Sequence, residues 1–497
     1  MKTFRVVWLV SLIVLAVHFL FRLVDQGKLL KYFPLDFAND MSAYITQLFF
    51  LKVCGFHQAC PYWYNGITTF KFSPPGWYFF TSPLLALFQD PKIAAYTSLI
   101  TTFLLGFVAL WYLGKKFNWS TSKRIGFFLF FFGNAIAIGG FIRLGRFHEL
   151  LAWVLFLFLF LVLWQYKDKK LDFKFYAASL LYAAIILTYQ STGVLVTVFL
   201  LGFILSRKGI AEKGKAVFFG LVGGLISSFW WWPFLRDINT SYISTLAHAE
   251  WLLSSSPKDI LTLIATVVLP LLMILAFFVY WKEQKKSKTL FFYFIPVLLL
   301  GFLFLTRVVI FIPVFNDIFP DPYLHFFMFF LLFFAFSTQG IHLSKLQKSV
   351  VMILIALFVI ASVSINIFST PYFKTHDALN EELKTLVAAV PDEQVYMILG
   401  DFRNTDSYPL AYYGFGAVYY EKYAVSGWYP EETSTDYILG LDEITRTFEQ
   451  KECSSFKEHL QNYNVTHVIS YQEGCITLQE CGLTEELKKE QTCLSSV

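Results

Sequence analysis

Long apolar runs alternate with short polar stretches along most of the chain, up to residue 368. Each run is close to the roughly 20 residues that an α-helix needs to cross the hydrocarbon core of a membrane. The pattern predicts a polytopic α-helical membrane protein with about 11 transmembrane helices. The predicted spans are residues 6–24, 93–114, 125–142, 149–166, 174–189, 193–207, 216–235, 259–281, 289–312, 322–341 and 349–368.

Positive charges between the runs predict how the helices are oriented. Lys and Arg gather in alternate loops, and positively charged loops stay in the cytoplasm. The N-terminus is therefore predicted in the cytoplasm and the chain after residue 368 outside it, in a multi-pass protein of the plasma membrane or the endoplasmic reticulum. The basic loops are residues 115–124, 167–174, 207–215, 282–288 and 342–349.

The connection from residue 25 to residue 92 forms a long first outer loop. It contains two stretches with helical patterns, 41–54 and 75–89, and the second is short and interrupted by Pro83. We predict that these stretches are amphipathic or interfacial helices and do not cross the membrane. A loop of this length is usually functional.

Residues 369–497 are much more polar and alternate between helical and strand-like patterns. The segment "ELKTLVAAVPDEQVYMIL" (382–399) is typical of a helix that leads into a buried strand, and "FKEHLQNY" followed by "VTHVISY" has the same order. The chain is thus predicted to consist of a membrane domain, residues 1–368, and a small extracytoplasmic α/β domain, residues 369–497.

The six cysteines agree with this orientation, because all of them fall on the predicted outer side. This placement favours disulfides in an oxidising compartment. Cys54 and Cys60 are the obvious local pair. The pairing of the four cysteines in the tail, Cys453, Cys475, Cys481 and Cys493, does not follow from the sequence.

Composition supports a membrane protein and excludes one class of partner. The 497 residues are 56% hydrophobic and 15% charged, whereas a soluble protein carries about 25% charged residues. The net charge of +5 is modest, and it gives no case for binding nucleic acid.

Two carboxylates, Asp36 and Asp40, stand in the first outer loop. Asp40 directly precedes "MSAYITQL", so it is a natural N-cap of the helix that follows. A capping aspartate can also act as a general base or a metal ligand. The sequence leaves both roles open, and it does not decide between Asp36 and Asp40.

Further candidates lie at the predicted outer ends of the spans. Arginine and lysine there suit a phosphate group, and carboxylates, histidines and aromatic rings suit the lining of a substrate cavity. The other interpretations are headgroup anchoring, a snorkelling lysine, structural histidines and an interfacial aromatic belt. The candidates for phosphate binding are Lys71, Arg143, Arg146 and Arg307, and those for cavity lining are Trp77, Tyr78, His148, Glu149, Tyr323 and His325.

The order of three motifs resembles the GT-C superfamily of membrane glycosyltransferases, which use polyprenyl-phosphate sugars. The acidic "DFANDMSAY" (36–44) follows the first span, and the proline pair of "KFSPPGWYFFTSPLLALF" (71–88) opens a helix, as in protein-mannosyl and aminoarabinose transferases. The stretch "GRFHELLAW" (145–153) is similar to one in archaeal and bacterial membrane proteins labelled "6-pyruvoyl-tetrahydropterin synthase related".

The resemblance implies an inverting glycosyltransferase that moves a sugar from a polyprenyl-phosphate donor to a lipid-linked glycan, glycolipid or protein acceptor. It assigns Asp40 or Asp36 as the catalytic base or metal-linked residue, and Lys71 with the three arginines as the donor phosphate site. A divalent cation, Mg²⁺ or Mn²⁺, is the one cofactor that it leaves open. The chain departs from the family pattern in its D-x-x-x-D spacing and in Gly76 after the proline pair.

Two other functions remain open at this stage. One is a non-catalytic scaffold subunit with the same fold, and the other is a lipid or solute transporter. Paired broken helices, which many transporters use at their binding sites, are not evident in the sequence.

Overall fold

The computed structural model describes residues 2–36, 40–237, 260–338, 345–403 and 405–497. The chain forms two compact units whose segments alternate along the sequence. Unit 1 comprises Met1–Val24, Leu99–Trp231 and Thr245–Pro371, and unit 2 comprises Asp25–Ser98, Trp232–Ser244 and Tyr372–Val497. The first outer loop therefore groups with the C-terminal region in unit 2.

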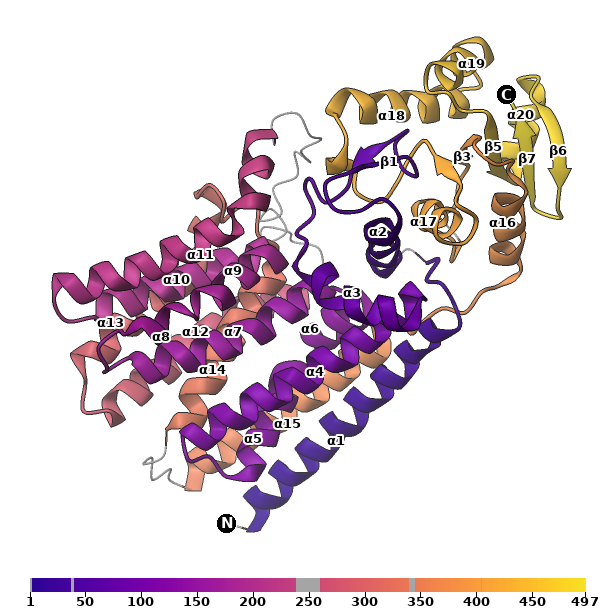
Figure 1. Cartoon of the computed structure of the whole chain (residues 1–497). Helices are drawn as coiled ribbons and strands as arrows, with labels where there is room; N and C mark the ends of the chain where they lie inside the picture. The colour runs from indigo at the N-terminus through magenta and orange to yellow at the C-terminus, as the bar shows by residue number, and fades with distance from the viewer. Residues whose placement is uncertain (1, 37–39, 238–259, 339–344, 404) are drawn as a thin grey trace. The chain divides into compact units, whose positions relative to one another are not determined.

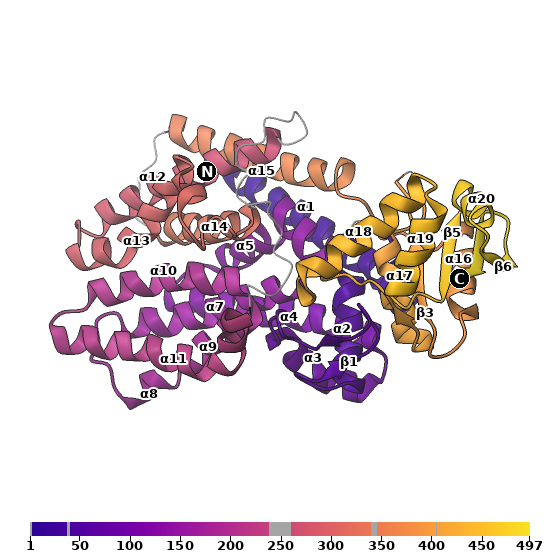
Figure 2. The same cartoon turned by 90° about the horizontal axis from the view of Figure 1, so that it is seen from above.

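Unit 1 is built from helices, several of which run side by side in Figures 1 and 2. Three of them, α1, α4 and α11, continue into unit 2. The elements are α1 (Lys2–Gln26), α4 (Pro91–Lys116), α5 (Thr121–Phe132), α6 (Ala135–Ala137), the π-helical turn η2 (Ile138–Arg143), α7 (Phe147–Tyr166), α8 (Phe173–Tyr176), α9 (Ser179–Thr188), α10 (Gln190–Ser206), α11 (Ile210–Asp237), α12 (Ile260–Glu283), α13 (Lys288–Leu305), the 3-10 turn η6 (Val308–Phe311), α14 (Pro320–Ser337) and α15 (Lys345–Phe368).

Eight helices of the described residues are long and apolar enough to cross a membrane, and a ninth candidate is α5 with α6 and η2, bent by 53°. The predicted spans 174–189 and 193–207 fall on two shorter apolar helices, Phe173–Thr188 and Gln190–Ser206. The polytopic helical fold is confirmed, but the count of about 11 spans is not. Parts of the predicted spans 259–281 and 322–341 lie outside the described residues.

Aromatic rings hold the helices of unit 1 together. Phe160 of α7 lies 5.0 Å from the ring centroids of both Phe329 and Phe333 of α14. At the crossing of α10 and α13, a Cβ atom on Gly202 would collide with the backbone carbonyl of Tyr293. Close packing of this kind is what associates helices in a lipid environment, where the hydrophobic effect between helices is absent.

The first outer loop folds within unit 2 around α2. The first ten residues of α2, Met41–Phe50, are all buried, so the helix predicted there is confirmed but its amphipathic character is not. Its neighbour α17 approaches it closely, because a Cβ on Gly414 would collide with the Thr46 hydroxyl. The elements of this loop are η1 (Gly27–Leu30), α2 (Met41–Val53), β1 (Ala59–Cys60), β2 (Ile67–Thr68) and α3 (Gly76–Phe88).

The C-terminal part of unit 2 is the small α/β domain that the sequence predicts. Its five-stranded sheet has the order β4-β3-β5-β7-β6, in which β3 is parallel to β4 and β5 while β7 is antiparallel to β5 and β6. Helices α16 and α20 pack on β5 and β7 (Figure 1). The elements are α16 (Ala378–Ala389), β3 (Val395–Leu399), α17 (Pro409–Tyr420), β4 (Tyr423–Ala424), the 3-10 turn η7 (Pro430–Glu432), α18 (Thr435–Glu449), α19 (Cys453–Asn462), β5 (His467–Tyr471), α20 (Glu473–Glu480), β6 (Thr484–Lys488) and β7 (Thr492–Ser496).

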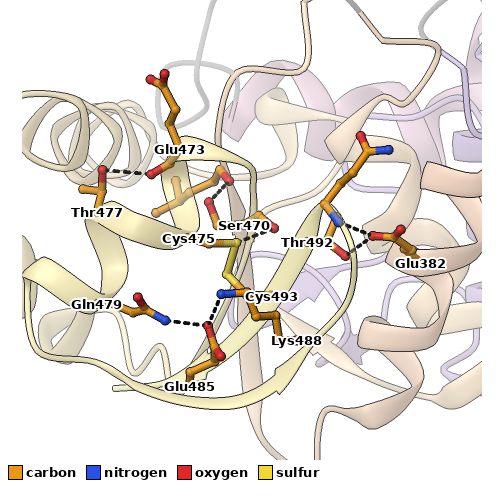
Figure 3. Close-up of a disulfide and its surroundings, with 12 residues drawn as sticks. Glu382, Ser470, Glu473, Cys475, Thr477, Gln479, Glu485, Lys488, Thr492 and Cys493 are labelled. Atoms are coloured by element: carbon orange, nitrogen blue, oxygen red, sulfur yellow. Dashed lines mark hydrogen bonds and ion pairs between the residues drawn. A yellow bond between two sulfur atoms is a disulfide. The ribbon is translucent and has the colours of Figure 1, made fainter.

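Three disulfides cross-link unit 2. Cys54–Cys60 confirms the predicted local pair, and the tail cysteines pair as Cys453–Cys481 and Cys475–Cys493. Figure 3 shows the Cys475–Cys493 bond joining α20 to β7, with Thr492 donating a hydrogen bond of 2.9 Å to Glu382. The bond thus fixes a helix to the strand on which it packs.

Replacing both Cys475 and Cys493 by serine is expected to destabilise unit 2 by about 3 kcal/mol, the loop-closure contribution for bridged residues 18 apart in sequence. Thermal unfolding of the purified protein in detergent measures this effect. The matched control is the wild-type protein under reducing conditions, which should unfold at an equal or lower temperature. A double-serine variant as stable as the oxidised wild type would contradict the prediction.

Candidate functional site

The predicted site residues divide between the two units. Unit 2 contains Asp36, Asp40, Lys71, Trp77 and Tyr78. Unit 1 contains Arg143, Arg146, His148, Glu149, Arg307, Tyr323 and His325.

Asp40 occupies the N-cap position of α2, but its side chain makes no capping hydrogen bond. Its backbone is already helical, with φ −90° and ψ −1°, whereas a capping residue normally has an extended backbone. Asp36 is buried, with 6% of its surface exposed, and residues 37–39 lie outside the described residues. The Asp40 side chain therefore does not cap α2.

A chain of hydrogen bonds connects the first loop to the C-terminal domain within unit 2. The Tyr78 hydroxyl donates to Gln47 Oε1 (2.5 Å), Gln47 Nε2 donates to Ser73 Oγ (3.0 Å), and Ser73 Oγ donates to Glu432 Oε1 (2.8 Å). All four side chains are buried. Elements α2, α3 and η7 are thereby fixed to one another at the middle of α2.

Aromatic rings surround this chain. The Tyr44 ring lies 6.0 Å from Trp77 and 6.4 Å from Tyr429, and Tyr429 lies 6.5 Å from Trp63. Trp77 and Tyr78, which the sequence proposed as substrate-lining residues, are completely buried. Trp77 and Tyr78 are therefore packing residues of unit 2 near the start of α2.

Glu431 and Glu432 are the acidic residues of η7, and both have unusual titration behaviour. Burial, with a contribution from the negative charge of Asp40, raises the pKa of Glu431 to about 7. Burial raises the pKa of Glu432 to about 8, against the hydrogen bond from Ser73, and the charge of Glu431 contributes. Asp40, Glu431 and Glu432 thus form a group of acids, which we call the carboxyl cluster.

Lys71 forms an ion pair with Asp237, with Nζ 3.3 Å from Oδ2. Asp237 also pairs with Arg236, with Nε 2.7 Å from Oδ1. Lys71 retains 29% of its side-chain surface. An anionic ligand of Lys71 would therefore compete with the Asp237 carboxylate.

The described helices of unit 1 contain a second polar group, centred on Glu149. This carboxylate is completely buried, and its Oε1 lies 3.1 Å from His325 Nδ1 and accepts a hydrogen bond of 3.1 Å from Trp153. Arg146 lies between two acids, 3.9 Å from Glu149 and 2.8 Å from Asp321. The structure therefore brings together three predicted residues, Arg146, Glu149 and His325.

The remaining candidates of unit 1 lie at three other positions. Arg143 and His148 are buried, with 2% and 4% of their surfaces exposed. Arg307 donates a hydrogen bond of 3.0 Å to the Thr266 hydroxyl. Tyr323 is buried and donates to a backbone carbonyl eight residues earlier.

Sequence reasoning did not identify the contribution of the C-terminal domain. Tyr429, Glu431 and Glu432 lie in the stretch "WYPEET", which carries no known motif. The only available signal was a pair of acids that directly follow an aromatic residue and a proline. Gln47 and Ser73 were missed because isolated amides and hydroxyls give no signal in a single sequence.

Among the described residues, no group of three histidine, cysteine, aspartate or glutamate side chains is arranged to hold a metal ion. No chemical step is assigned to a metal.

Comparisons with solved structures show the fold. The mycobacterial arabinofuranosyltransferase AftD matches with a TM-score of 0.62 and 13% identity, over 97% of this chain and 40% of AftD. ArnT from Cupriavidus metallidurans matches with a TM-score of 0.57 and 11% identity, over 98% of this chain and 97% of ArnT. The oligosaccharyltransferase of Archaeoglobus fulgidus, in complex with Zn and sulfate, matches with a TM-score of 0.52 and 13% identity, over 91% of this chain and 67% of that one. The chain therefore shares the fold of these three proteins.

Sequence comparison shows the family. No curated protein matches the chain. The family model described as "6-pyruvoyl-tetrahydropterin synthase related domain; membrane protein" matches residues 70–369, which is more than half of the chain. The matched region includes the proline-pair motif (71–88) and "GRFHELLAW" (145–153). The chain therefore belongs to the 6-pyruvoyl-tetrahydropterin synthase related family of membrane proteins.

Proposed function

We propose that this protein is an inverting membrane glycosyltransferase that transfers a sugar from a polyprenyl-phosphate donor to a lipid-linked glycan, glycolipid or protein acceptor. The observation that carries this proposal is the carboxyl cluster of unit 2, in which Asp40 stands at the start of α2 and Glu431 and Glu432 stand in η7. The fold supports it, because proteins with this fold include glycosyltransferases solved with dolichol-phosphate and with undecaprenyl phosphate. Fold alone does not determine function, so the residues must account for the chemistry.

In the proposed reaction an acceptor hydroxyl attacks the anomeric carbon of the sugar. The new bond forms between the acceptor oxygen and this carbon, while the bond from carbon to phosphate oxygen breaks and its electron pair leaves with the phosphate. The hydroxyl proton passes to the carboxylate of Asp40, or of Asp36 if that residue is the base. One displacement with a phosphate leaving group needs one base, unlike hydrolysis by two carboxylates.

The donor phosphate requires positive charge, and arginine provides it with a forked set of hydrogen-bond donors. Arg146 is the best-defined candidate, since Glu149 and Asp321 hold its guanidinium on two sides. Arg143 and Arg307 are the other candidates in unit 1, and Lys71 is the candidate in unit 2. Glu149, His148, His325 and Tyr323 have supporting roles from buried positions.

The orientation deduced from the basic loops extends this proposal. It places the N-terminus in the cytoplasm and the C-terminal domain outside, in the plasma membrane or the endoplasmic reticulum. The three disulfides of unit 2 support it, because disulfides persist in oxidising compartments.

The proposal is tested by incubating the purified protein, reconstituted in lipid, with a panel of undecaprenyl- and dolichyl-phosphate hexoses and pentoses. Release of the polyprenyl phosphate together with formation of a glycosylated acceptor in a membrane extract supports it. A protein that consumes no donor of the panel contradicts it and favours a scaffold subunit. Movement of solute or lipid across the bilayer without consumption of donor favours a transporter.

Replacing Asp321 by asparagine is expected to tighten binding of undecaprenyl phosphate by roughly 3- to 10-fold, or about 1 kcal/mol. The Asp321 carboxylate holds Arg146 at 2.8 Å, so it competes with a phosphate for the same guanidinium. Native mass spectrometry in lipid nanodiscs measures the affinity. The exposed Asp317 provides a control, Asp317→Asn, which should bind as the wild type does. Weaker binding by Asp321→Asn would show that Asp321 instead positions Arg146.

A further inference from the structure

Glu431 and Glu432 are adjacent in η7, yet their surroundings differ. Hydrogen bonds connect Glu432 to the first outer loop. Ser73 Oγ and the backbone amides of Phe72 and Ser73 donate these bonds to its carboxylate. Among the described residues, Glu431 receives a hydrogen bond from its own backbone amide and from no other group. Glu432 therefore has a structural role that Glu431 does not share.

The electrostatic environment of Glu431 contains negative charge without a compensating cation. Glu431 follows Tyr429 and Pro430, and the Tyr429 ring lies 6.4 Å from the ring of Tyr44, whose backbone amide donates a hydrogen bond of 3.2 Å to the Asp40 carbonyl. The charge of Asp40 acts on Glu431, and the charge of Glu431 acts on Glu432. No lysine, arginine or histidine of the described chain acts on either glutamate. The Glu431 carboxyl group therefore lies near another negative charge, which disfavours its ionised form, and no cation of the described residues stabilises it.

Two further polar atoms in this region lack hydrogen-bond partners among the described residues. They are Oε2 of Glu432, whose side chain is more than nine-tenths buried, and Nε1 of Trp63, which is completely buried and packs against Tyr429. Buried polar atoms are normally satisfied. Unsatisfied polar atoms near Tyr429 and in η7 favour a polar ligand, such as a hydroxylated sugar or acceptor.

We propose that Glu431 is a second catalytic carboxyl beside Asp40, and that the two carboxyls together hold the acceptor group and receive its proton. This inference rests on the proposed glycosyltransferase function. It gives the C-terminal domain a direct part in the reaction.

The chemistry follows from the proximity of two like charges. Neighbouring carboxyls do not ionise independently, and over an intermediate pH range such a pair holds one proton. The ionised member takes the proton of the attacking hydroxyl as the new glycosidic bond forms and the phosphate leaves. The protonated member donates a hydrogen bond to another hydroxyl of the acceptor and orients it.

The kinetic test compares Glu431→Gln with Glu449→Gln, a control at an exposed position of α18 in the same domain. We expect Glu431→Gln to lower kcat by roughly 10- to 100-fold, to leave the KM for the lipid donor unchanged, and to shift the acidic limb of the pH profile. Activity and pH profile equal to those of Glu449→Gln would overturn the inference. So would an equal loss of activity at every pH, which indicates a structural effect.

Infrared spectroscopy provides a readout that does not depend on the donor. Between pH 6 and pH 9, the infrared band of protonated carboxyl groups should disappear in the wild type. In Glu431→Gln, part of this band should be absent. In Asp40→Asn, the same part should disappear at a lower pH than in the wild type. If the band is identical in the wild type and Glu431→Gln, the shared proton is disproved. The two proposals fail differently: a wild-type protein that consumes no donor removes the glycosyltransferase function, whereas an active wild type with a fully active Glu431→Gln variant removes only the role of Glu431.

Discussion

Replacing Asp40 by asparagine is expected to reduce sugar transfer by at least ~100-fold, the usual contribution of a general base. Asparagine has the same shape and still accepts hydrogen bonds, but it does not take a proton. The substitution should not weaken α2, because the Asp40 side chain makes no capping hydrogen bond. Transfer from a polyprenyl-phosphate sugar at saturating donor measures the effect, with circular dichroism to confirm the fold.

The matched control is Asp36→Asn, which removes the other carboxylate of the same motif. Asp36 is more deeply buried, with 6% of its surface exposed, so we expect this variant to retain measurable turnover. Loss of turnover in Asp36→Asn together with full activity in Asp40→Asn would reverse the assignment. Binding of undecaprenyl phosphate should be unchanged in both variants.

The sequence predicts the fold class well because the strongest signals are local. Apolar runs predict membrane helices, and the helix-then-strand pattern of 382–399 predicts α16 and β3, both of which are present. Spacing alone identifies Cys54–Cys60. By contrast, the pairs Cys453–Cys481 and Cys475–Cys493 depend on how α19, α20 and β7 pack, which no local pattern encodes.

The number of membrane spans and the complete burial of α2 were harder to predict than the fold class. Hydropathy does not distinguish an apolar helix inside a protein from one in lipid, so residues 41–54 gave a helix but not its burial on all sides. The helices Phe173–Thr188 and Gln190–Ser206 are apolar but shorter than the other candidate spans. Because these two helices are short, composition alone does not determine whether they cross the membrane.

The candidate site was predicted in part, and the missing part comes from long-range contacts. Asp40 is recognisable because it lies between the first apolar run and a helix. Glu432 contacts Ser73 across 359 positions of sequence, and no single-sequence pattern joins residues so far apart. The pairing of Arg146 with Asp321, 175 positions away, was missed for the same reason.

The carboxyl cluster should also make unit 2 less stable as the pH rises from about 5.5 to about 8.5. Glu432 has a pKa of about 8 in the folded protein and a pKa close to the ordinary glutamate value of 4.5 in the unfolded protein. The folded state therefore binds more protons between these values, and its stability falls through this window. The cost of the ionised Glu432 at pH 8.5 is on the order of 4 kcal/mol, with a similar contribution from Glu431. Asp401 and Glu381, whose pKa values are lowered by Arg403 and Lys384, are ionised in both states above about pH 5.5 and do not oppose this trend.

Glu432→Gln is therefore expected to raise the unfolding temperature of unit 2 at pH 8.5 and to change it little or lower it at pH 5.5. The amide still accepts the hydrogen bond from Ser73, but its buried NH₂ donors cost about 1–3 kcal/mol, so the net gain at pH 8.5 is about 2 kcal/mol. Differential scanning fluorimetry in detergent at the two pH values measures it, with Glu449→Gln as a control that should follow the wild type. An unfolding temperature of the wild type that stays constant or rises between pH 5.5 and pH 8.5 would contradict the raised pKa values. A gain of equal size at both pH values would mean that Glu432 is destabilising through its packing and not through its charge.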